Sequence, residues 1–269
     1  MLTSKGTNKA ETRIADMGSA VSQYLDALRQ RASSLKLLYE NLRRLGPLPV
    51  EGQEITTSIL RTLKTYYDVE DEVKWFLGKR VRGDAADFFV EILLIYIRAF
   101  IETHNLALEA VSEKSIRAKR GSPRPDISVW QGEQLVAVIE CKTNLGWNRH
   151  EWQNDFIKRE DKIHGHFPDA TCFLVVLTGV NWPGFKDNPR VGDQYFTLSK
   201  IWPSDVNLDH PEDSIRNPVE PLFRQLRDLG REQASVQPTE VAVRHQQGPQ
   251  SRKRIEAGSG RRTNGQGRR

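Results

Sequence analysis

Three ionisable residues in the middle of the chain have types and spacing suited to catalysis. Asp126 precedes Glu140 by fourteen positions, and Lys142 follows two positions later. The five residues before Glu140 are all apolar, which predicts that 135–142 is a central, buried strand. Alternate strand residues share a face, so Glu140 and Lys142 lie together, opposite Cys141. A buried carboxylate and ammonium are costly unless paired or bound to a metal, and proteins tend to keep such groups where they are used.

Asp126 stands at the start of the preceding predicted strand. The Gly-containing turn at 131–133 predicts a β-hairpin that folds Asp126 back to within a few ångströms of Glu140. Two close carboxylates raise each other's pKa unless a cation lies between them. An all-oxygen site suits a hard divalent ion, Mg²⁺ or alternatively Mn²⁺. Lys142 beside that ion could hold an attacking water or stabilise charge on a phosphate.

The segment Pro125-Asp126, thirteen intervening residues and Glu140-Cys141-Lys142 resembles the PD-(D/E)xK motif of the restriction-endonuclease-like nucleases. Each motif residue is present, and the resemblance covers about 84–200. It is supported by the two adjacent strands, the turn between them and the order of helices and strands around them. It implies an α/β fold, with a restriction-endonuclease-like mixed β-sheet core flanked by helices.

The resemblance also implies a role for each residue. Asp126 and Glu140 would be direct metal ligands, with the backbone carbonyl of Cys141 as a third, and Lys142 would orient or activate the water. The family often adds an acid from the helix before the sheet. Glu91 fits this fourth catalytic position.

Glu91 has two competing interpretations. Asp87, one turn earlier on the same helical face, is the alternative acid. Glu91 could instead serve only as an ion-pair partner of Arg98.

Two donor-rich stretches are candidates for DNA contact. The first, directly before Asp126, either grips phosphates or is a solvated loop, and it comprises Lys114, Arg117, Lys119, Arg120 and Arg124. The second mixes donors with aromatic residues on a predicted helix, and it comprises Asn144, Trp147, Asn148, Arg149, His150, Trp152, Gln153, Lys158 and Arg159. Some family members place a Gln or Lys there, which makes Gln153 and Lys158 candidates. His164 and His166 are too isolated in the sequence to indicate zinc.

These residues must be positioned by two regions of different periodicity. Residues 1–80 predict a helical region in which two long helices, broken at Gly46 and Pro47, form an antiparallel hairpin. Its apolar seam steps by fours and threes from Val21 to Leu42. The simplest interpretation is packing between these helices and onto the core; the alternatives are a dimerisation arm and a substrate clamp.

Residues 81–230 predict the nuclease-like α/β core. A helix at about 84–103 precedes strand-like runs near 106–117, 125–130 and 135–142. A helix at 148–164, strands at 171–177 and 195–201 and a helix at 217–229 follow.

The remaining residues, 231–269, predict a basic, disordered tail. Residues 244–269 hold eight basic groups against Glu256, a net charge of +7, so the other 243 residues sum to −2 within the total of +5. The basic pI of about 9.2 therefore says little about the folded body. The tail is either attracted to phosphates or simply solvated.

The remaining composition points to a protein of the cytoplasm. The chain starts without a signal-like apolar stretch, and the apolar window 88–101 is too short to span a membrane. Cys141 and Cys172 lie in apolar runs without CxxC spacing, which predicts buried free thiols.

The main expectation is a Mg²⁺-dependent nuclease that hydrolyses DNA phosphodiester bonds, most similar to restriction-type endonucleases. One alternative is a catalytically inactive DNA-binding or assembly protein of the same fold, and another is a structure-specific DNA repair nuclease. DNA is the expected partner. A homodimer would suit cleavage of both strands, with the helical hairpin as one available surface.

Overall fold

The computed structural model describes residues 5–145, 151–180, 185 and 187–232, with side chains from residue 17 onward except those of Trp152 and Glu232. The predicted tail beyond Glu232 lies outside this range, as do Trp147, Asn148, Arg149 and His150. The elements in chain order are α1 (Lys5–Arg44), α2 (Glu54–Leu77), α3 (Ala86–Thr103), β1 (Glu109–Ser112), β2 (Ile127–Gln131), β3 (Gln134–Lys142), α4 (Trp152–His164), β4 (Thr171–Thr178), β5 (Tyr195–Ser199) and α5 (Glu220–Glu232), with two short 3₁₀ helices (Pro203–Asp205 and Pro211–Ser214) before α5.

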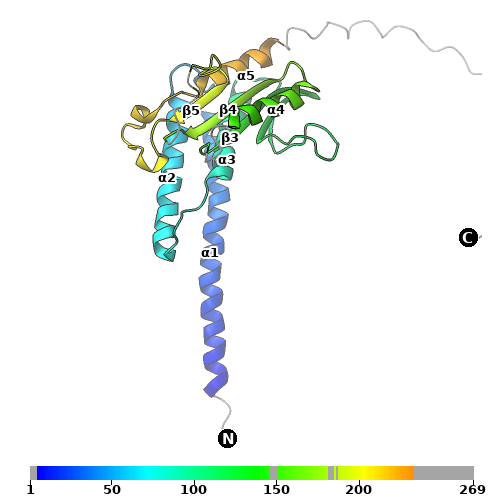
Figure 1. Ribbon diagram of the computed structural model, residues 1–269. Coiled ribbons are helices and arrows are strands. Elements are labelled where there is room, and N and C mark those ends of the chain that lie inside the picture. Colours follow the sequence, from blue (N-terminus) through cyan, green and yellow to red (C-terminus); the bar gives the residue numbers. More distant parts are fainter. Residues whose placement is uncertain (1–4, 146–150, 181–184, 186, 233–269) are drawn as a thin grey trace, which may run out of the picture. The chain divides into compact units, whose positions relative to one another are not determined.

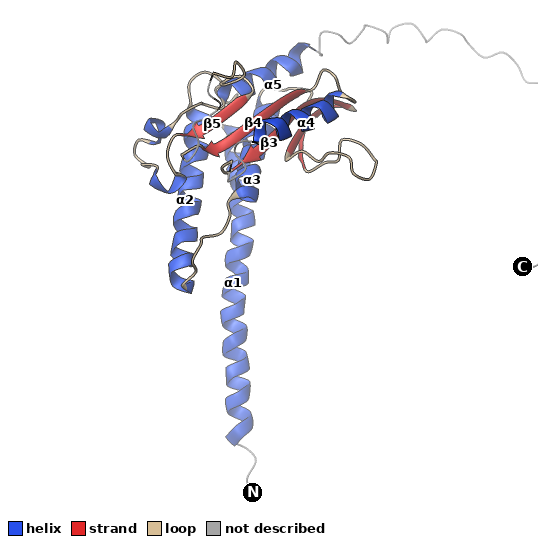
Figure 2. Ribbon diagram, in the orientation of Figure 1, coloured by secondary structure: helices blue, strands red, loops and turns tan. Residues whose placement is uncertain are grey.

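The mixed α/β architecture expected from the sequence is confirmed (Figures 1 and 2). The five strands form one sheet in the order β1-β2-β3-β4-β5, so β3 is central as predicted. The pairs β1–β2 and β2–β3 are antiparallel, whereas β3–β4 and β4–β5 are parallel. The expected strand at 106–117 is shorter than predicted, because β1 ends at Ser112 and the basic residues after it lie in a loop.

The predicted hairpin joins β2 and β3. Gln131 pairs with Gln134, which leaves Gly132 and Glu133 as a two-residue turn. Gly132 has φ of +57°, a left-handed conformation that glycine adopts without steric cost. The β2–β3 register places Ile127 opposite Ile139, so its continuation brings Asp126 opposite Glu140.

Helices cover both faces of the sheet. Ile139 and Cys141 of β3 point into the main core, which also contains buried residues of α2, α3 and α5. Val138 points to the other face, where Phe156 and Ile163 of α4 pack. The α2 residues Ile59, Leu60 and Leu63 are completely buried in the main core, so the N-terminal region shares its core with the sheet.

The prediction that the α1 seam packs chiefly against α2 is wrong. The C-terminal part of the seam, including Leu35 and Leu42, packs into the main core, and the contacts of α1 are chiefly with α3 rather than α2. Arg31 of α1 pairs with Glu91 of α3, at 2.9 Å. The N-terminal part of the seam, from Val21 to Leu28, is exposed. Heptad spacing shows that a helix has a packing face, but α3, a far more apolar helix, competes successfully for that face.

Two further expectations concern apolar segments. Cys141 and Cys172 are free and buried, as predicted. Among the described residues, no helix is long and apolar enough to cross a membrane.

Candidate active site

The β2–β3 hairpin brings the three motif residues together. Glu140 and Lys142 project from the end of β3 on the face that α4 covers, because Ile139 and Cys141 occupy the opposite face. Asp126 immediately precedes β2, and its backbone carbonyl accepts hydrogen bonds from Ser112 Oγ (2.9 Å) and the Glu113 amide (3.3 Å). These bonds hold the residue against β1.

The ammonium of Lys142 marks a point on which three oxygens converge. Its Nζ lies 3.3 Å from Asp126 Oδ2, 3.6 Å from Glu140 Oε2 and 3.0 Å from the carbonyl oxygen of Cys141. Asp126 is further oriented by the amide of Cys141, which donates to Asp126 Oδ2 at 2.7 Å. The three atoms that the motif predicts as metal ligands are therefore within reach of a single cation.

Arg159 supplies a second cation, from α4. Its guanidinium Nη1 lies 2.5 Å from Glu140 Oε2. The Glu140 side chain is only 6% exposed, whereas that of Arg159 is 55% exposed. The pair therefore runs from the buried strand end to the surface. Sequence reasoning placed Arg159 in the donor-rich stretch but favoured Gln153 and Lys158, and only the position of Arg159 on α4 distinguishes it.

The surroundings of Glu140 have opposing effects on its pKa. Burial, followed by the nearby charge of Asp126, raises the pKa of Glu140 above its usual value, and Arg159 and Lys142 partly offset this increase. Burial also raises the pKa of the Cys141 thiol well above its usual value. The thiol points into the core, so Cys141 offers the site only its backbone carbonyl.

The donor set fits a hard divalent cation. Two carboxylates and one backbone carbonyl provide oxygen ligands alone, which suits Mg²⁺ and Mn²⁺ better than softer metals. The ammonium of Lys142 occupies the point between these oxygens: it donates hydrogen bonds to Asp126 Oδ2 and the Cys141 carbonyl and lies 3.6 Å from Glu140 Oε2. An ion that binds at the same point would displace that ammonium.

Glu91 lies apart from these contacts. It belongs to α3, which packs on the Ile139 side of the sheet, and its carboxylate binds Arg31. Arg98, the partner in the alternative interpretation, instead donates its Nε to the carbonyl of Ala110 at 2.9 Å. Asp87 is exposed. The role of Glu91 as a fourth catalytic residue stays a prediction.

The two stretches proposed for DNA contact occupy exposed positions. Lys119, Arg120 and Arg124 are exposed in the loop between β1 and β2. In the same loop, Lys114 lies 4.1 Å from the centre of the Trp130 ring, and Arg117 contacts the His166 ring.

On α4, the two candidates chosen from the sequence make no described contact with the motif residues. Gln153 is exposed, and Lys158 pairs with Asp155 at 3.5 Å. Their role in DNA contact stays a prediction.

Another group of metal-ligating types was not foreseen. His164, considered isolated in the sequence, lies near Glu160 and Cys172, and the three ligand atoms are within 4.8 Å of one another. Each polar partner is already engaged: Arg190 binds Glu160 through both terminal nitrogens, and His164 Nε2 contacts the carbonyl of Ala170 at 2.9 Å. This group therefore has a structural explanation as a tie between α4 and the segments around it.

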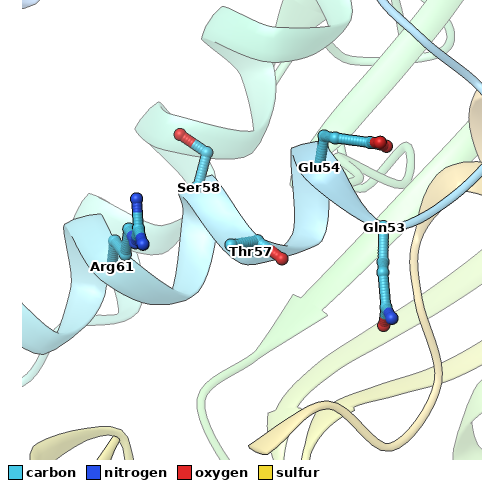
Figure 3. Close-up of a pocket in the computed structure, with 5 residues that line it drawn as sticks. All are labelled: Gln53, Glu54, Thr57, Ser58 and Arg61. Carbon is cyan, nitrogen blue, oxygen red and sulfur yellow. The ribbon is translucent and has the colours of Figure 1, made fainter. Parts of the chain in front are cut away.

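None of the motif residues lines the best-defined surface pocket of the described chain. The residues that line it are all of polar or charged types and lie at the start of α2; they are Gln53, Glu54, Thr57, Ser58 and Arg61 (Figure 3). It adds no residue to the candidate active site.

Comparisons with known proteins leave the family open. No protein-family model and no curated protein matches the chain. One solved structure, described as the native BbvCI A2B2 tetramer at low resolution, aligns with 65% of this chain and 88% of that chain at 10% identity, with a TM-score of 0.25. A TM-score this low does not establish a common fold, so any functional conclusion depends on the geometry of the site.

Proposed function

We propose that this protein is a Mg²⁺-dependent nuclease that hydrolyses DNA phosphodiester bonds, of the restriction-endonuclease type. The observation that carries the proposal is the convergence of Asp126 Oδ2, Glu140 Oε2 and the Cys141 carbonyl on one cationic group, the ammonium of Lys142. Glu140 is only 6% exposed at the end of a buried strand, and a carboxylate in such a place is costly to maintain without a use.

Each side chain then has a chemical task. Asp126, Glu140 and the Cys141 carbonyl would hold the metal, which would supply positive charge to offset the charge that develops on the phosphate. Lys142 would donate hydrogen bonds to the attacking water or to a phosphate oxygen once its ammonium leaves the carboxylates. Arg159 is exposed enough to reach a phosphate while remaining beside Glu140. The negative charge of a bound phosphate would replace the carboxylates as the partner of Lys142 and Arg159.

The test is cleavage of plasmid and short duplex DNA by the purified chain with Mg²⁺, and with EDTA in its place. We expect Glu140→Gln, which keeps the shape of the side chain, to reduce cleavage by at least about 100-fold, because it removes a charged metal ligand. The matched control is Glu133→Gln, in the exposed β2–β3 turn, which should cleave like the unaltered chain. Cleavage that survives Glu140→Gln or EDTA would refute the proposal.

Metal binding gives an independent measurement. Mg²⁺ should raise the melting temperature of the unaltered chain and of Glu133→Gln, but not that of Glu140→Gln, because ligands that bind only the folded state stabilise it. DNA binding without cleavage on every substrate, together with no response to Mg²⁺, would favour the inactive DNA-binding alternative. Cleavage restricted to branched substrates would favour a structure-specific repair nuclease.

A further inference from the structure

Exposed apolar side chains are concentrated on two helical segments. Of the sixteen large hydrophobic residues that are exposed in the described part of the chain, eleven lie in segment 17–28 of α1 or in segment 69–81, which comprises the end of α2 and the four residues after it. They are Met17, Val21, Tyr24, Leu25, Leu28, Val69, Val73, Trp75, Phe76, Leu77 and Val81. We call these two segments the open helical face.

The open helical face begins beyond the first turn of α3, where α3 no longer packs against α1 and α2. Tyr66 of α2 stacks on Phe88 in the first turn of α3, with ring centres 4.3 Å apart, and the guanidinium of Arg31 of α1 lies 5.8 Å from the centre of the same ring. The three helices therefore meet near Phe88. Beyond this point α1 and α2 continue without α3, which begins at Ala86 (Figure 1).

On α1 the exposed residues continue a seam that is packed elsewhere. Val21 and Leu28 precede Leu35 by fourteen and seven residues, so they lie on the same stripe of the helix. Leu35 packs against the main core, whereas Val21 is 55% exposed. Gly18, Ser19 and Ser22 are weak helix formers, and a helix of such composition depends on packing for its stability. The stripe therefore needs a partner.

The summed exposed area of the two segments is comparable to what one partner contributes to a stable interface. Trp75 and Phe76 are 77% and 87% exposed, and the eleven side chains together expose roughly 1,000 Å². The largest apolar patch of a typical monomer is about 300–600 Å², and one partner of a stable complex contributes about 800 Å².

The charges indicate a partner that is not strongly charged. Segment 69–81 has three acids, at 70–72, and three bases, Lys74, Lys79 and Arg80, so its net charge is zero. In segment 17–28 the single charged residue, Asp26, pairs with Arg29 at 2.6 Å. A nucleic acid or an anionic membrane surface would require an excess of bases.

We propose that the open helical face binds the same face of a second copy of this chain and forms a two-fold symmetric homodimer. In a two-fold contact each patch meets itself, so balanced acids and bases can pair across the axis. An antiparallel contact with its axis near Trp75 and Phe76 brings Glu72 of one copy towards Lys79 of the other. It also places the two aromatic residues at the centre, where binding energy concentrates.

The mass of the full-length chain in solution tests this proposal, by sedimentation equilibrium from about 1 to 100 µM. We expect a dimer for the unaltered chain, and at least about a tenfold weaker self-association for Trp75→Ser combined with Phe76→Ser, because central aromatic residues are interface hot spots. Leu208→Ser is the matched control: Leu208 is 42% exposed outside the open helical face, and its substitution should leave the dimer unchanged.

Circular dichroism distinguishes dissociation from unfolding, since dissociated variants should keep the spectrum of a folded α/β protein. A monomer at every concentration of the unaltered chain would overturn the proposal, as would a dimer insensitive to the double substitution. DNA binding by a monomer that is lost on the same double substitution would assign the face to nucleic acid instead. None of these outcomes depends on whether the protein cleaves DNA.

Cross-linking tests the position of the axis. The two native thiols are buried, so a cysteine introduced at Phe76 would be the accessible one. We expect Phe76→Cys to form a disulfide-linked dimer on mild oxidation. Leu208→Cys, treated in the same way, should form no such dimer. Failure of Phe76→Cys to cross-link would overturn an axis near this residue.

Discussion

At the end of β3, two carboxylates and two cationic side chains lie close together, and of the four only Glu140 is nearly buried. Because burial and Asp126 raise the pKa of Glu140, its ionised form is less favourable in the folded chain than in the unfolded chain. For a raised pKa, the contribution to stability is complete below the unfolded value of about 4.5 and is lost as the pH rises through the folded value. At neutral pH the metal-free site is thus a cost to folding, which a bound cation would relieve.

Arg159 and Lys162 provide a matched comparison on α4. Since the charge of Arg159 lowers the pKa of Glu140, Arg159→Ala should raise that pKa further. Protons then compete with the metal for Glu140 at higher pH, so the loss of cleavage on acidification should begin at higher pH than in the unaltered chain. We also expect cleavage at neutral pH to fall by about 10- to 100-fold.

Cleavage rates across a pH series, at fixed Mg²⁺, measure both effects. Lys162→Ala is the control, because Lys162 is exposed in the last turn of α4 and belongs to neither candidate stretch, so its substitution should affect neither the rate nor the pH profile. A lower rate with an unshifted acidic limb would mean that Arg159 acts only on the substrate.

Among the elements, α2 and α5 are joined by a buried polar contact that holds the helices on one face of the sheet. The Glu220 carboxylate accepts hydrogen bonds from the Thr56 amide at 3.0 Å and from Thr56 Oγ1 at 2.6 Å. Thr56 Oγ1 in turn accepts from the Val219 amide at 2.7 Å. Thr56 and Glu220 are essentially unexposed, so water cannot replace these bonds.

Thr56→Val removes the hydroxyl while keeping the shape of the side chain. We expect it to lower the free energy of unfolding by about 2–3 kcal/mol, because the Val219 amide and one carboxylate oxygen are left without partners. Urea unfolding measures the change as a shift of the midpoint. Thr65→Val, at an exposed position of the same helix, should change stability by less than about 0.5 kcal/mol. Equal effects of the two substitutions would contradict the importance of this contact.

For the whole molecule, the distribution of charge separates a nearly neutral body from a basic C-terminal segment. Residues 244–269 carry +7, and the rest of the chain sums to −2 within the total of +5. The body nevertheless has its own basic loop before Asp126, with Lys119, Arg120 and Arg124 exposed. Either group could supply the attraction to phosphates.

Replacing the eight bases of 244–269 by glutamine in the full chain distinguishes the two sources. If the segment binds phosphates, DNA affinity should fall and its dependence on salt should weaken by several units of slope, at about 0.9 per lost phosphate contact. Replacing Lys119, Arg120 and Arg124 by glutamine should weaken the slope by at most about 3. Fluorescence anisotropy across a salt series measures both. An unchanged slope in the eight-base variant would show that the segment is merely solvated.

The local sequence pattern was sufficient to predict the central strand of the sheet and the hairpin that it belongs to. The apolar run before Glu140 and the glycine turn predicted a buried strand in a hairpin, and strand alternation separated Glu140 and Lys142 from Cys141; these features depend on neighbours in the sequence and on the period of a strand. The burial of both cysteines followed in the same way. The predictions that the structure bears out are thus those whose physical cause is local.

Tertiary packing decided which distant side chains meet. The sequence could not distinguish Arg159 from Lys158, because both are basic residues of the same helix. Only the packing of α4 against the sheet places Arg159, and not Lys158, beside Glu140. Sequence reasoning paired the α1 seam with the next helix along the chain, whereas the more apolar α3 takes that position and engages Glu91 through Arg31. Residue types and period determine that a helix has a face to bury; the competition among all available surfaces determines against what, and here it leaves the end of α1 exposed.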